Sequence, residues 1–296
     1  MKKLLSGNEA IARGAYEAGI QVATGYPGTP SSEILQTIAG EYGEDIYSEW
    51  STNEKVAMDV AAGAAYSGKR TLVTTKQVGM NVMADSLLYT VYTGAEAGLV
   101  IVTADDPGFF STQNEQDNRW YGKLGKIPIL EPKDSQEAKD FVVKGIQMSE
   151  EFDTPILVRT TMRTSHSKGV VEIEKRPDVE KETPPFPRKQ KKYVMTAQWA
   201  KERHPIVEKR LEDISDYAED CSFNSIEWGE KDIGIITSAV VYTYAKDVFP
   251  NASFLRLGMT HPLPRDLIKR FSEEVERVLV VEELDPFLEE RIKAMG

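Results

Sequence analysis

Several loops in the first part of the chain contain side chains that could bind a ligand or do chemistry. The first is GYPGTPSSE at residues 25–33, where Thr29 and Pro30 precede an expected helix. Thr29 could cap that helix and Pro30 suits its first turn, which would leave the amide groups of Ser31 and Ser32 free to bind an anion. The alternative is an ordinary capped turn between a strand and a helix, with no ligand.

A glutamate begins the next helical pattern, EKVAMDVAAGAAY, at residue 54. The alanines and the glycine of this segment predict a narrow helix that a second backbone or a flat ring can approach closely. Glu54 lies in the first turn, where it could offer a carboxyl group to such a ring. Alternatively, it serves only to stabilise the positive end of the helix dipole.

Polar segments also follow the next apolar runs, at Thr74–Asn81, Thr103–Gly108 and Ser111–Arg119. Because the carboxyl ends of parallel strands meet at one edge of a sheet, we expect these segments to converge with residues 25–33 on one crevice. Asp105 and Asp106 are adjacent and lack the ligand spacing of a metal site, so we expect no metal there.

The histidines, His166, His204 and His261, are scattered and have no ligand or catalytic partner at a recognisable spacing. We therefore expect neither a zinc site nor a Ser-His-Asp triad. His261 is expected to end a strand before a helix. The acidic pair Glu282 and Glu283 follows a further strand, and we assign it to an interface or domain contact rather than to chemistry.

The elements that must position these loops alternate apolar runs with helical patterns, which predicts a doubly wound parallel α/β sheet. The expected strands are Ile20–Gly25, Asp45–Ser48, Thr71–Thr75, Leu99–Thr103 and Pro155–Arg159, and the expected helices are Asn8–Ala18, Ser31–Glu41, Glu54–Ser67, Asn81–Gly94 and Gln136–Ser149.

We assign residues 1–169 to this domain and residues 170–195, with Pro177, Pro184, Pro185 and Pro187, to a linker. Residues 196–296 form a smaller α/β domain that begins with the helix Ala197–Tyr217. We expect its sheet to be parallel and the two domains to fold independently.

Composition excludes several classes of protein. The 296 residues contain 36 Lys and Arg against 47 Asp and Glu, and the net charge of −11 opposes binding to nucleic acid or anionic lipid. No apolar stretch approaches the ~20 residues needed to span a bilayer, and no signal-length apolar run follows the first residues, so we expect a cytoplasmic protein. The single cysteine, Cys221, excludes an intrachain disulfide and a cysteine-rich iron–sulfur motif.

Taken in order, these segments resemble the alpha-subunit family of indolepyruvate ferredoxin oxidoreductases, which are thiamine-diphosphate-dependent 2-oxoacid:ferredoxin oxidoreductases. The blocks in the first domain are residues 25–33, 53–57 (NEKVA), 75–82 (TKQVGMNV), 104–108 (ADDPG) and 111–119 (STQNEQDNR). In the second domain, residues 235–238 (IITS), 257–264 (LGMTHPLP) and 281–286 (VEELDP) resemble the family's transketolase-C-terminal-like domain. The resemblance covers essentially the whole chain and implies a pyrimidine-binding domain followed by that second domain.

The resemblance also implies roles for individual residues. In that family a glutamate hydrogen-bonds the ring nitrogen of the cofactor's aminopyrimidine and relays a proton, and Glu54 stands at the matching position. Thr29 matches a threonine that contacts the substrate carboxylate. Relatives that act on pyruvate have an arginine after the fourth strand, where this chain has Asp105 and Asp106. The other implied positions are Gly25, Tyr26, Pro27, Gln77 and Asn81 around the cofactor, and Lys76 and Arg119 as candidates for the carboxylate clamp.

The implied reaction is oxidative decarboxylation of an aryl 2-oxoacid such as indolepyruvate to an acyl-coenzyme A, with electrons passing through iron–sulfur clusters to ferredoxin. The family's diphosphate-and-magnesium domain and its cysteine-rich tail have no counterpart in the 296 residues. We therefore expect this chain to bind only the pyrimidine end of thiamine diphosphate and to be inactive alone.

The diphosphate-binding domain, the magnesium, the iron–sulfur clusters and a beta subunit are then expected in other parts of a homo- or hetero-oligomer. Two alternatives stay open. The chain could be a non-catalytic partner subunit that keeps the fold, or a partner domain of another thiamine-diphosphate enzyme, such as a transketolase or a decarboxylase.

Overall fold

A seven-stranded sheet forms the centre of the N-terminal part of the chain in the computed structural model, which describes residues 1–180 and 182–296. Its strands are, in spatial order, β12 (Met259–His261), β6 (Ile129–Leu130), β7 (Ile156–Thr161), β5 (Leu99–Asp105), β4 (Thr71–Lys76), β2 (Val22–Gly25) and β3 (Tyr47–Trp50). All neighbours run parallel except β12 and β6. The predicted parallel α/β sheet is confirmed, and the fully buried β5 has the continuous apolar run typical of a strand covered on both faces.

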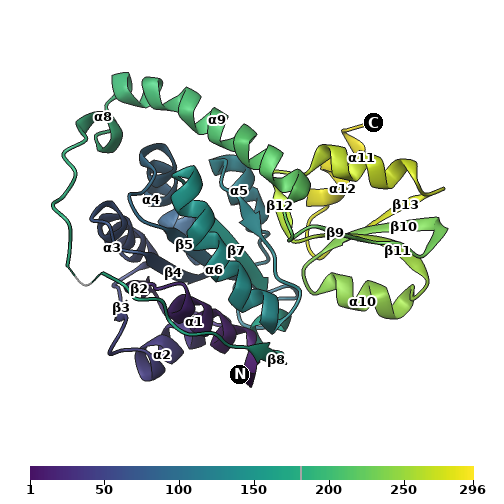
Figure 1. Ribbon diagram of the computed structural model, residues 1–296, viewed down its shortest axis with the longest axis horizontal. Coiled ribbons are helices and arrows are strands. Elements are labelled where there is room, and N and C mark those ends of the chain that lie inside the picture. Colours follow the sequence, from purple (N-terminus) through teal and green to yellow (C-terminus); the bar gives the residue numbers. More distant parts are fainter. Residues whose placement is uncertain (181) are drawn as a thin grey trace.

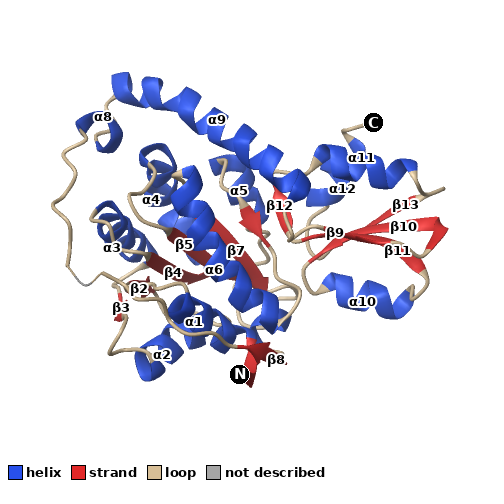
Figure 2. Ribbon diagram, in the orientation of Figure 1, coloured by secondary structure: helices blue, strands red, loops and turns tan. Residues whose placement is uncertain are grey.

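Helices cover both faces of this sheet (Figure 2). One face packs against α1 (Gly7–Glu17), α2 (Ser32–Glu41) and α6 (Ser135–Phe152), and the other against α3 (Glu54–Tyr66), α4 (Gly79–Thr93) and α5 (Arg119–Gly125). Short polar residues fix several of the helix starts: Ser6 caps α1, Asn53 caps α3 and Asp134 caps α6.

A four-stranded sheet forms the C-terminal part, in the order β13 (Val278–Val281), β10 (Glu230–Ser238), β11 (Ala252–Leu257) and β9 (Ser225–Glu227). The helix α10 (Val241–Val248) lies on one side of it, and α11 (Arg265–Glu273) and α12 (Phe287–Lys293) lie on the other (Figure 1). The expectation of an entirely parallel second sheet is wrong, because β9 pairs antiparallel with β11. As predicted, His261 ends a strand and a helix follows it.

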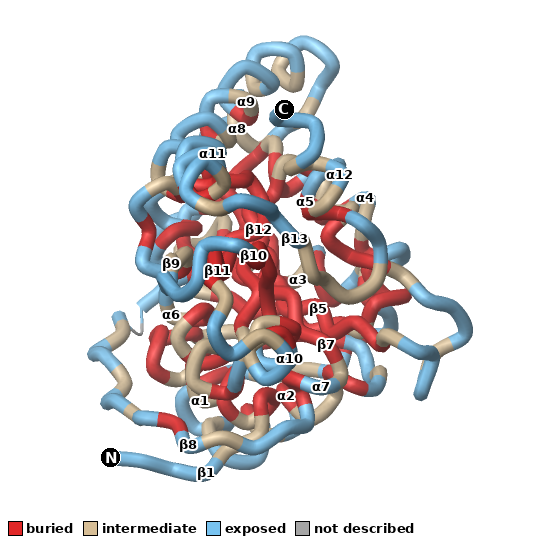
Figure 3. The backbone as a smooth tube through the Cα atoms, turned by 90° about the vertical axis from the view of Figure 1, so that its right-hand side faces the viewer, coloured by how far each residue is buried: buried red, intermediate tan, exposed pale blue. Residues whose placement is uncertain are grey.

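The two parts share a sheet edge and a hydrophobic core. β12, from the C-terminal part, pairs with β6 at the edge of the first sheet. One buried cluster joins α3, α4 and the first sheet to Ile236, Leu255 and Phe271. Buried residues accordingly run through the middle of the molecule in Figure 3, while exposed residues follow the outer turns. This packing does not support the expectation that the two parts fold independently.

A long excursion connects the two parts. After the short helix α7 (Met162–His166), β8 (Lys168–Glu172) pairs with β1 (Lys2–Ser6), so the expected boundary between residues 169 and 170 falls inside a strand. The chain then runs along the outside of the first part to α8 (Gln190–Tyr193) and crosses to the second part through α9 (Ala197–Asp220) (Figure 1).

The described residues of this excursion between β8 and α8, 173–180 and 182–189, form no helix or strand. Arg176 holds them against the first part by donating to the carbonyls of Tyr16 and Ile20 at 2.9 and 2.8 Å. The long helix α9 is rich in charged residues, and no helix among the described residues has the length and apolar character needed to cross a membrane.

Candidate active site

β2 is the topological switch point of the first sheet. The chain passes from β2 outward to β3 on one side and then returns to β4 on the other, so Gly25 at the end of β2 is paired with both Trp50 and Thr74. Open α/β sheets bind ligands in the crevice outside the carboxyl ends of their strands at such a point. The crevice predicted from the polar loops is therefore expected at the end of β2.

Glu54 lies beside this crevice, as the first residue of α3. Asn53 caps the helix, and its side-chain oxygen accepts a hydrogen bond from the amide of Val56 at 2.9 Å. Thr24 of β2 ties the helix to the sheet by donating to the carbonyl of Ala57 at 2.8 Å. These contacts hold Glu54 with only 7% of its surface exposed.

The carboxyl group of Glu54 has no hydrogen-bond partner among the described residues. Buried carboxyl groups are normally hydrogen-bonded, so an unpartnered one beside a crevice points to a ligand. Gly79, the first residue of α4, faces it: a Cβ atom at Gly79 would lie 2.5 Å from Glu54 Oε1 and 2.2 Å from Thr75 Oγ1. A carboxyl group in this position can hydrogen-bond a nitrogen atom of a flat heterocycle and exchange a proton with it.

The turn after β2 differs from the expected start of a helix. The amides of Ser31 and Ser32 donate to the carbonyl of Gly28 at 2.9 and 3.1 Å, so they are not free to bind an anion. The helix α2 begins at Ser32 with Ser31 as its N-cap, and the expectation that Thr29 caps it is wrong. The side chain of Thr29 is exposed, and its carbonyl accepts a hydrogen bond from Ser111 Oγ at 3.3 Å.

Gly25, Tyr26 and Pro27 form the rim of the crevice at the end of β2. Gly25 is buried against β4, where a Cβ atom would lie 2.5 Å from Thr74 Oγ1. That oxygen is itself buried and unpartnered among the described residues. Tyr26 and Pro27 are exposed, so their backbone and side chains are open to a ligand.

Lys76 ends β4 and lies over the same turn. Its aliphatic stem packs on Gly28, where a Cβ atom would lie 2.7 Å from Lys76 Cδ. Its ammonium group forms no ion pair or hydrogen bond with the residues that the structure describes. A cation without a partner beside the crevice suits an anionic ligand.

Gln77 and Asn81 organise the neighbouring loop. The buried amide of Gln77 donates to the carbonyl of Asn114 at 2.6 Å and accepts a hydrogen bond from the amide of Asp106. Asn81 is exposed and exchanges two hydrogen bonds with Gln116, at 2.8 and 3.1 Å. Both residues thus tie the start of α4 to the polar segment 106–116, which the structure brings to the same edge of the sheet.

Arg119 is buried, and its guanidinium group forms ion pairs and hydrogen bonds with other residues of the chain. It pairs with Asp117 at 2.5 Å and with Glu282 at 2.7 Å, and it donates to the carbonyls of Glu283 and Asp285 at 2.8 and 3.0 Å. We therefore do not retain Arg119 as a clamp for a substrate carboxylate. Glu282 makes the domain contact that was predicted for the acidic pair.

A buried charge cluster behind these loops was missed from the sequence. Arg159 of β7 donates to Asp105 at 2.8 Å and pairs with Glu131, and none of the three is more than 2% exposed. Burial raises the pKa of Asp105 to about 6, against the lowering effect of Arg159. The signal that could have found the cluster is an arginine inside the otherwise apolar run of β7.

Asp105 and Asp106 are both used within the protein. Asp105 pairs with Arg159, and Asp106 accepts a hydrogen bond from the amide of Ser111 at 2.6 Å. Within residues 1–180 and 182–296, no group of three or more His, Cys, Asp or Glu side chains is arranged to hold a metal ion.

Comparison with known proteins finds related sequences over the whole chain. The family model described as pyruvate flavodoxin/ferredoxin oxidoreductase, thiamine diP-binding, matches residues 13–219. The indolepyruvate oxidoreductase subunit IorA of Archaeoglobus fulgidus is 46% identical over 306 residues, covering 100% of this chain and 49% of that protein. The corresponding subunit of Methanothermobacter thermautotrophicus is 41% identical over 303 residues, covering 100% and 49%. The chain spans about half the length of these curated relatives.

Solved structures share the fold. A 2-oxoglutarate:ferredoxin oxidoreductase from Magnetococcus marinus, with 2-oxoglutarate, coenzyme A and succinyl-CoA bound, aligns with a TM-score of 0.81 at 17% identity, over 100% of this chain and 60% of that one. A split gene transketolase, an inactive beta4 tetramer, aligns with a TM-score of 0.62 at 15% identity, over 98% and 84%. These likenesses confirm the predicted fold class.

Proposed function

We infer the function from one premise: the chain belongs to the pyruvate flavodoxin/ferredoxin oxidoreductase family, through its thiamine diphosphate-binding part. We propose that it forms the pyrimidine-binding half of a thiamine diphosphate site in a 2-oxoacid:ferredoxin oxidoreductase that acts on an aryl 2-oxoacid such as indolepyruvate. The observation that carries the proposal is the buried carboxyl group of Glu54, which has no partner among the described residues and faces Gly79 at the switch point of the sheet.

The residues of the crevice fit the pyrimidine end of the cofactor. Glu54 has carboxyl oxygens available for a ring nitrogen, and a side chain at Gly79 would collide with that carboxyl group. Tyr26 and Pro27 border the crevice, and Gln77 with Asn81 holds the loop that frames it. Thiamine diphosphate, when bound, supplies the stabilisation of a carbanion that decarboxylation of a 2-oxoacid requires.

Glu54 is the proposed proton relay. In this role its carboxyl group holds a proton at an oxygen atom and shares it with the pyrimidine nitrogen. Burial keeps water from competing for that proton, and the Asn53 cap and the bond from Thr24 to Ala57 fix the start of the helix that carries it.

Lys76 and Thr29 are the proposed contacts for the substrate carboxylate. Lys76 covers the turn that contains Thr29, and its ammonium group is unpaired among the described residues. The Thr29 side chain is exposed on that turn. A lysine supplies charge to a carboxylate, and a hydroxyl group supplies a directed hydrogen bond.

The remaining parts of the reaction are proposed to lie outside this chain. Further domains or subunits of a homo- or hetero-oligomer, including a beta subunit, would bind the cofactor's diphosphate with magnesium, hold the iron–sulfur clusters and contact coenzyme A and ferredoxin. The names of the relatives support indolepyruvate as the substrate class, and the bound molecules of the 2-oxoglutarate enzyme support coenzyme A as the acyl acceptor. We place this assembly in the cytoplasm, without a nucleic acid or membrane partner.

Replacing Glu54 by glutamine in the complete enzyme tests the proposal. Glutamine keeps the shape and can still donate a hydrogen bond, but it cannot transfer a proton, so turnover should fall by about 10²–10⁴-fold. Deuterium exchange at the thiazolium carbon of the bound cofactor should slow by a similar factor. Asp59→Asn is the matched control, because it removes a carboxylate from an exposed position of the same helix and should leave both rates unchanged.

A role limited to the helix dipole makes a different prediction for Glu54→Gln. The variant would lose ~0.3–1 kcal/mol of stability and keep its activity. Equal exchange rates in wild type and variant would therefore reject the proton relay.

A further inference from the structure

A large cavity lies between α9, α11, α12 and the end of β12, with a volume of about 1180 Å³. None of the residues that we assign to the cofactor crevice lines it. Pockets for small molecules typically enclose ~300–1,000 Å³, so this cavity can hold a molecule of metabolite size.

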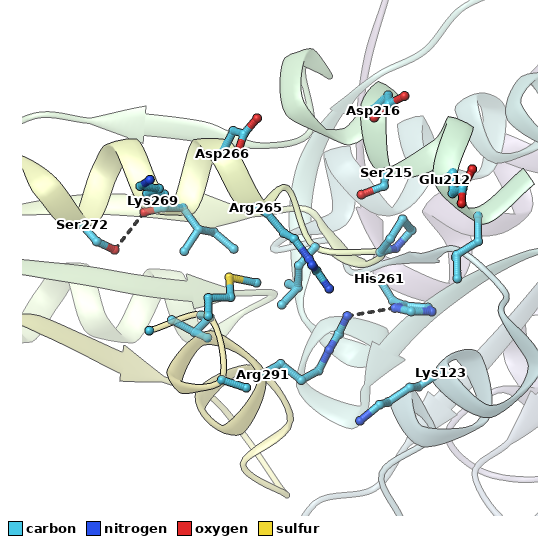
Figure 4. Close-up of a pocket in the computed structure, with 18 of the residues that line it drawn as sticks. Lys123, Glu212, Ser215, Asp216, His261, Arg265, Asp266, Lys269, Ser272 and Arg291 are labelled. Carbon is cyan, nitrogen blue, oxygen red and sulfur yellow. Dashed lines mark hydrogen bonds between the residues drawn. The ribbon is translucent and has the colours of Figure 1, made fainter. Parts of the chain in front are cut away.

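Three cationic side chains line this cavity: Arg265 of α11 and Arg291 of α12 point toward each other (Figure 4), and Lys123 of α5 lies below them with its ammonium group 4.9 Å over the ring of Trp120. None of them forms an ion pair with a carboxylate in the described part of the chain. Arg291 instead donates to the carbonyl of Thr260 at 3.0 Å and lies over the ring of Phe287 at 4.7 Å. Three unpaired cations in one cavity are unexpected in a chain with a net charge of −11.

His261 lies in the lining of the same cavity and holds Arg291 in place. Its Nδ1 lies 3.0 Å from Nη2 of Arg291 (Figure 4), and because a guanidinium group only donates, Nδ1 is the acceptor and the ring proton is on Nε2. His261 is 6% exposed, and Nε2 has no partner among the described residues. Burial, and then the charges of Arg291 and Lys123, lower the pKa of His261 to about 3, so the ring is neutral.

The cations are close enough to affect one another. Burial, and then the charge of Arg265, lower the pKa of Arg291 to about 10. An anion between the two guanidinium groups would remove this repulsion. The acidic residues Glu212 and Asp216 also line the cavity, but they lie on α9, away from Arg291 and His261 (Figure 4).

The other acidic residues of the lining do not offset the charge of Arg265, Arg291 and Lys123 by direct pairing. Glu208 pairs with Lys126 at 2.8 Å, and Glu273 lies 3.9 Å from Lys269. Asp266 is exposed and forms no ion pair among the described residues. The basic side of the cavity is therefore open to a ligand.

We propose that this cavity binds a phosphate-bearing small molecule, whose phosphate is held between the guanidinium groups of Arg265 and Arg291, with Lys123 adding positive charge to the lining. A phosphate group offers several acceptor oxygens and up to two negative charges, which matches a pair of guanidinium groups. The remaining volume, on the α9 side, accommodates the rest of the molecule. The site is independent of the cofactor crevice and does not depend on the proposed function.

Calorimetric titration of the 296-residue chain with pyrophosphate, at low ionic strength, tests the site. Wild type should bind one pyrophosphate per chain with saturation. Arg265→Gln removes an exposed cation that forms no hydrogen bond or ion pair among the described residues, and it should weaken binding by about tenfold or more. Arg270→Gln is the matched control on the same helix, exposed and outside the cavity, and it should change the affinity by less than about twofold.

Thermal unfolding provides a second readout, because a ligand that binds only the folded chain raises Tm. Pyrophosphate should raise Tm in wild type and in Arg270→Gln, and raise it less in Arg265→Gln. Absence of saturable binding would overturn the proposal, as would equal losses in the two variants, which would indicate general attraction to surface charge. If acetate at the same ionic strength raises Tm as much as pyrophosphate, the phosphate assignment is wrong.

Discussion

Asp105 shares a single guanidinium group, that of Arg159, with Glu131, and all three side chains are buried. Burial disfavours the charged form of Asp105 and outweighs its pairing with Arg159, so the pKa of Asp105 is raised to about 6. Ser238 of the C-terminal part donates to Glu131 at 3.4 Å. The cluster therefore lies where the two parts of the molecule meet, behind the loop that frames the crevice.

The raised pKa of Asp105 predicts a pH-dependent contribution to stability. An unfolded aspartate loses its proton near pH ~3.9, whereas folded Asp105 keeps its proton until about pH 6. The folded state therefore binds more protons between these values, and the free energy of unfolding falls as pH rises through this window, by at most ~3 kcal/mol. Asp105→Asn removes this titration. Urea unfolding should show wild type losing stability relative to the variant from about pH 4 to about pH 6, and parallel profiles would contradict the assignment.

The sequence predicts single residues well where their role depends on local pattern. Glu54 follows a strand and a capping asparagine, so its place at the edge of the sheet could be predicted. Arg119 could not be predicted in the same way, because its partner Glu282 lies 163 residues further along the chain. The prediction that Thr29 caps the helix was wrong for another reason. The amides of Ser31 and Ser32 donate to the carbonyl of Gly28 instead, and sequence alone does not show which of two nearby acceptors an amide will use.

At the scale of elements, the approach of α4 to α3 shapes the crevice, and Gly79 makes it possible. Alanine is favoured over glycine in helices by ~1 kcal/mol, but a Cβ atom at Gly79 would lie 2.5 Å from Glu54 Oε1 and 2.2 Å from Thr75 Oγ1. We expect Gly79→Ala to displace Glu54 and to weaken thiamine diphosphate binding in the complete enzyme by about tenfold or more.

Gly63→Ala is the matched control for this prediction. Gly63 lies inside α3, is exposed, and has no atom within 4 Å of an added Cβ. This variant should gain ~0.5–1 kcal/mol in urea unfolding and keep its cofactor affinity. Unchanged cofactor affinity in Gly79→Ala would show that the contact between α4 and Glu54 does not shape the site.

Elements defined by caps and long apolar runs were predicted closely, whereas the short strands β1 and β8 and the pairing of β12 with β6 were not. The expected helix 54–67 is observed at Glu54–Tyr66, and the expected strand 99–103 at Leu99–Asp105. β1 and β8 pair Lys2 with Glu172, and β12 pairs with β6, so each depends on a partner far away in the sequence. β1 and β8 are only a few residues long and have too little local pattern to be recognised, whereas the strand that ends at His261 was expected and only its pairing with β6 was not.

At the scale of the whole molecule, alternating strands and helices predicted the doubly wound sheet, but not how the two parts are joined. The linker was expected to separate two independent units. Instead, β12 adds to the first sheet, and Ile236 and Leu255 of the C-terminal part belong to a core cluster that includes α3 and α4. A core shared between sequence segments so far apart cannot be inferred from either segment alone.

This shared core predicts the outcome of cutting the chain in the excursion between β8 and α8. Lys175 and Arg188 are exposed and lie outside any helix or strand, so trypsin should cut there first. The two fragments should nevertheless co-elute on a sizing column in native buffer, because the pairing of β12 with β6 and the common core remain. They should separate only in denaturant.

Arg119→Gln should loosen this association. Removing the guanidinium leaves the carboxylates of Asp117 and Glu282 uncompensated, and breaking a buried ion pair in this way typically costs ~3–5 kcal/mol. The pair with Glu282 crosses the junction between the two parts, and the pair with Asp117 lies within the first part. The nicked variant should therefore dissociate at a lower urea concentration than nicked wild type. Lys209→Gln is the control, since it breaks only exposed pairs with Asp213 and Glu212 on α9 and should leave the midpoint unchanged. Separate elution of the wild-type fragments in native buffer would mean that the two parts are independent domains, and that β12 and the common core contribute little to holding them together.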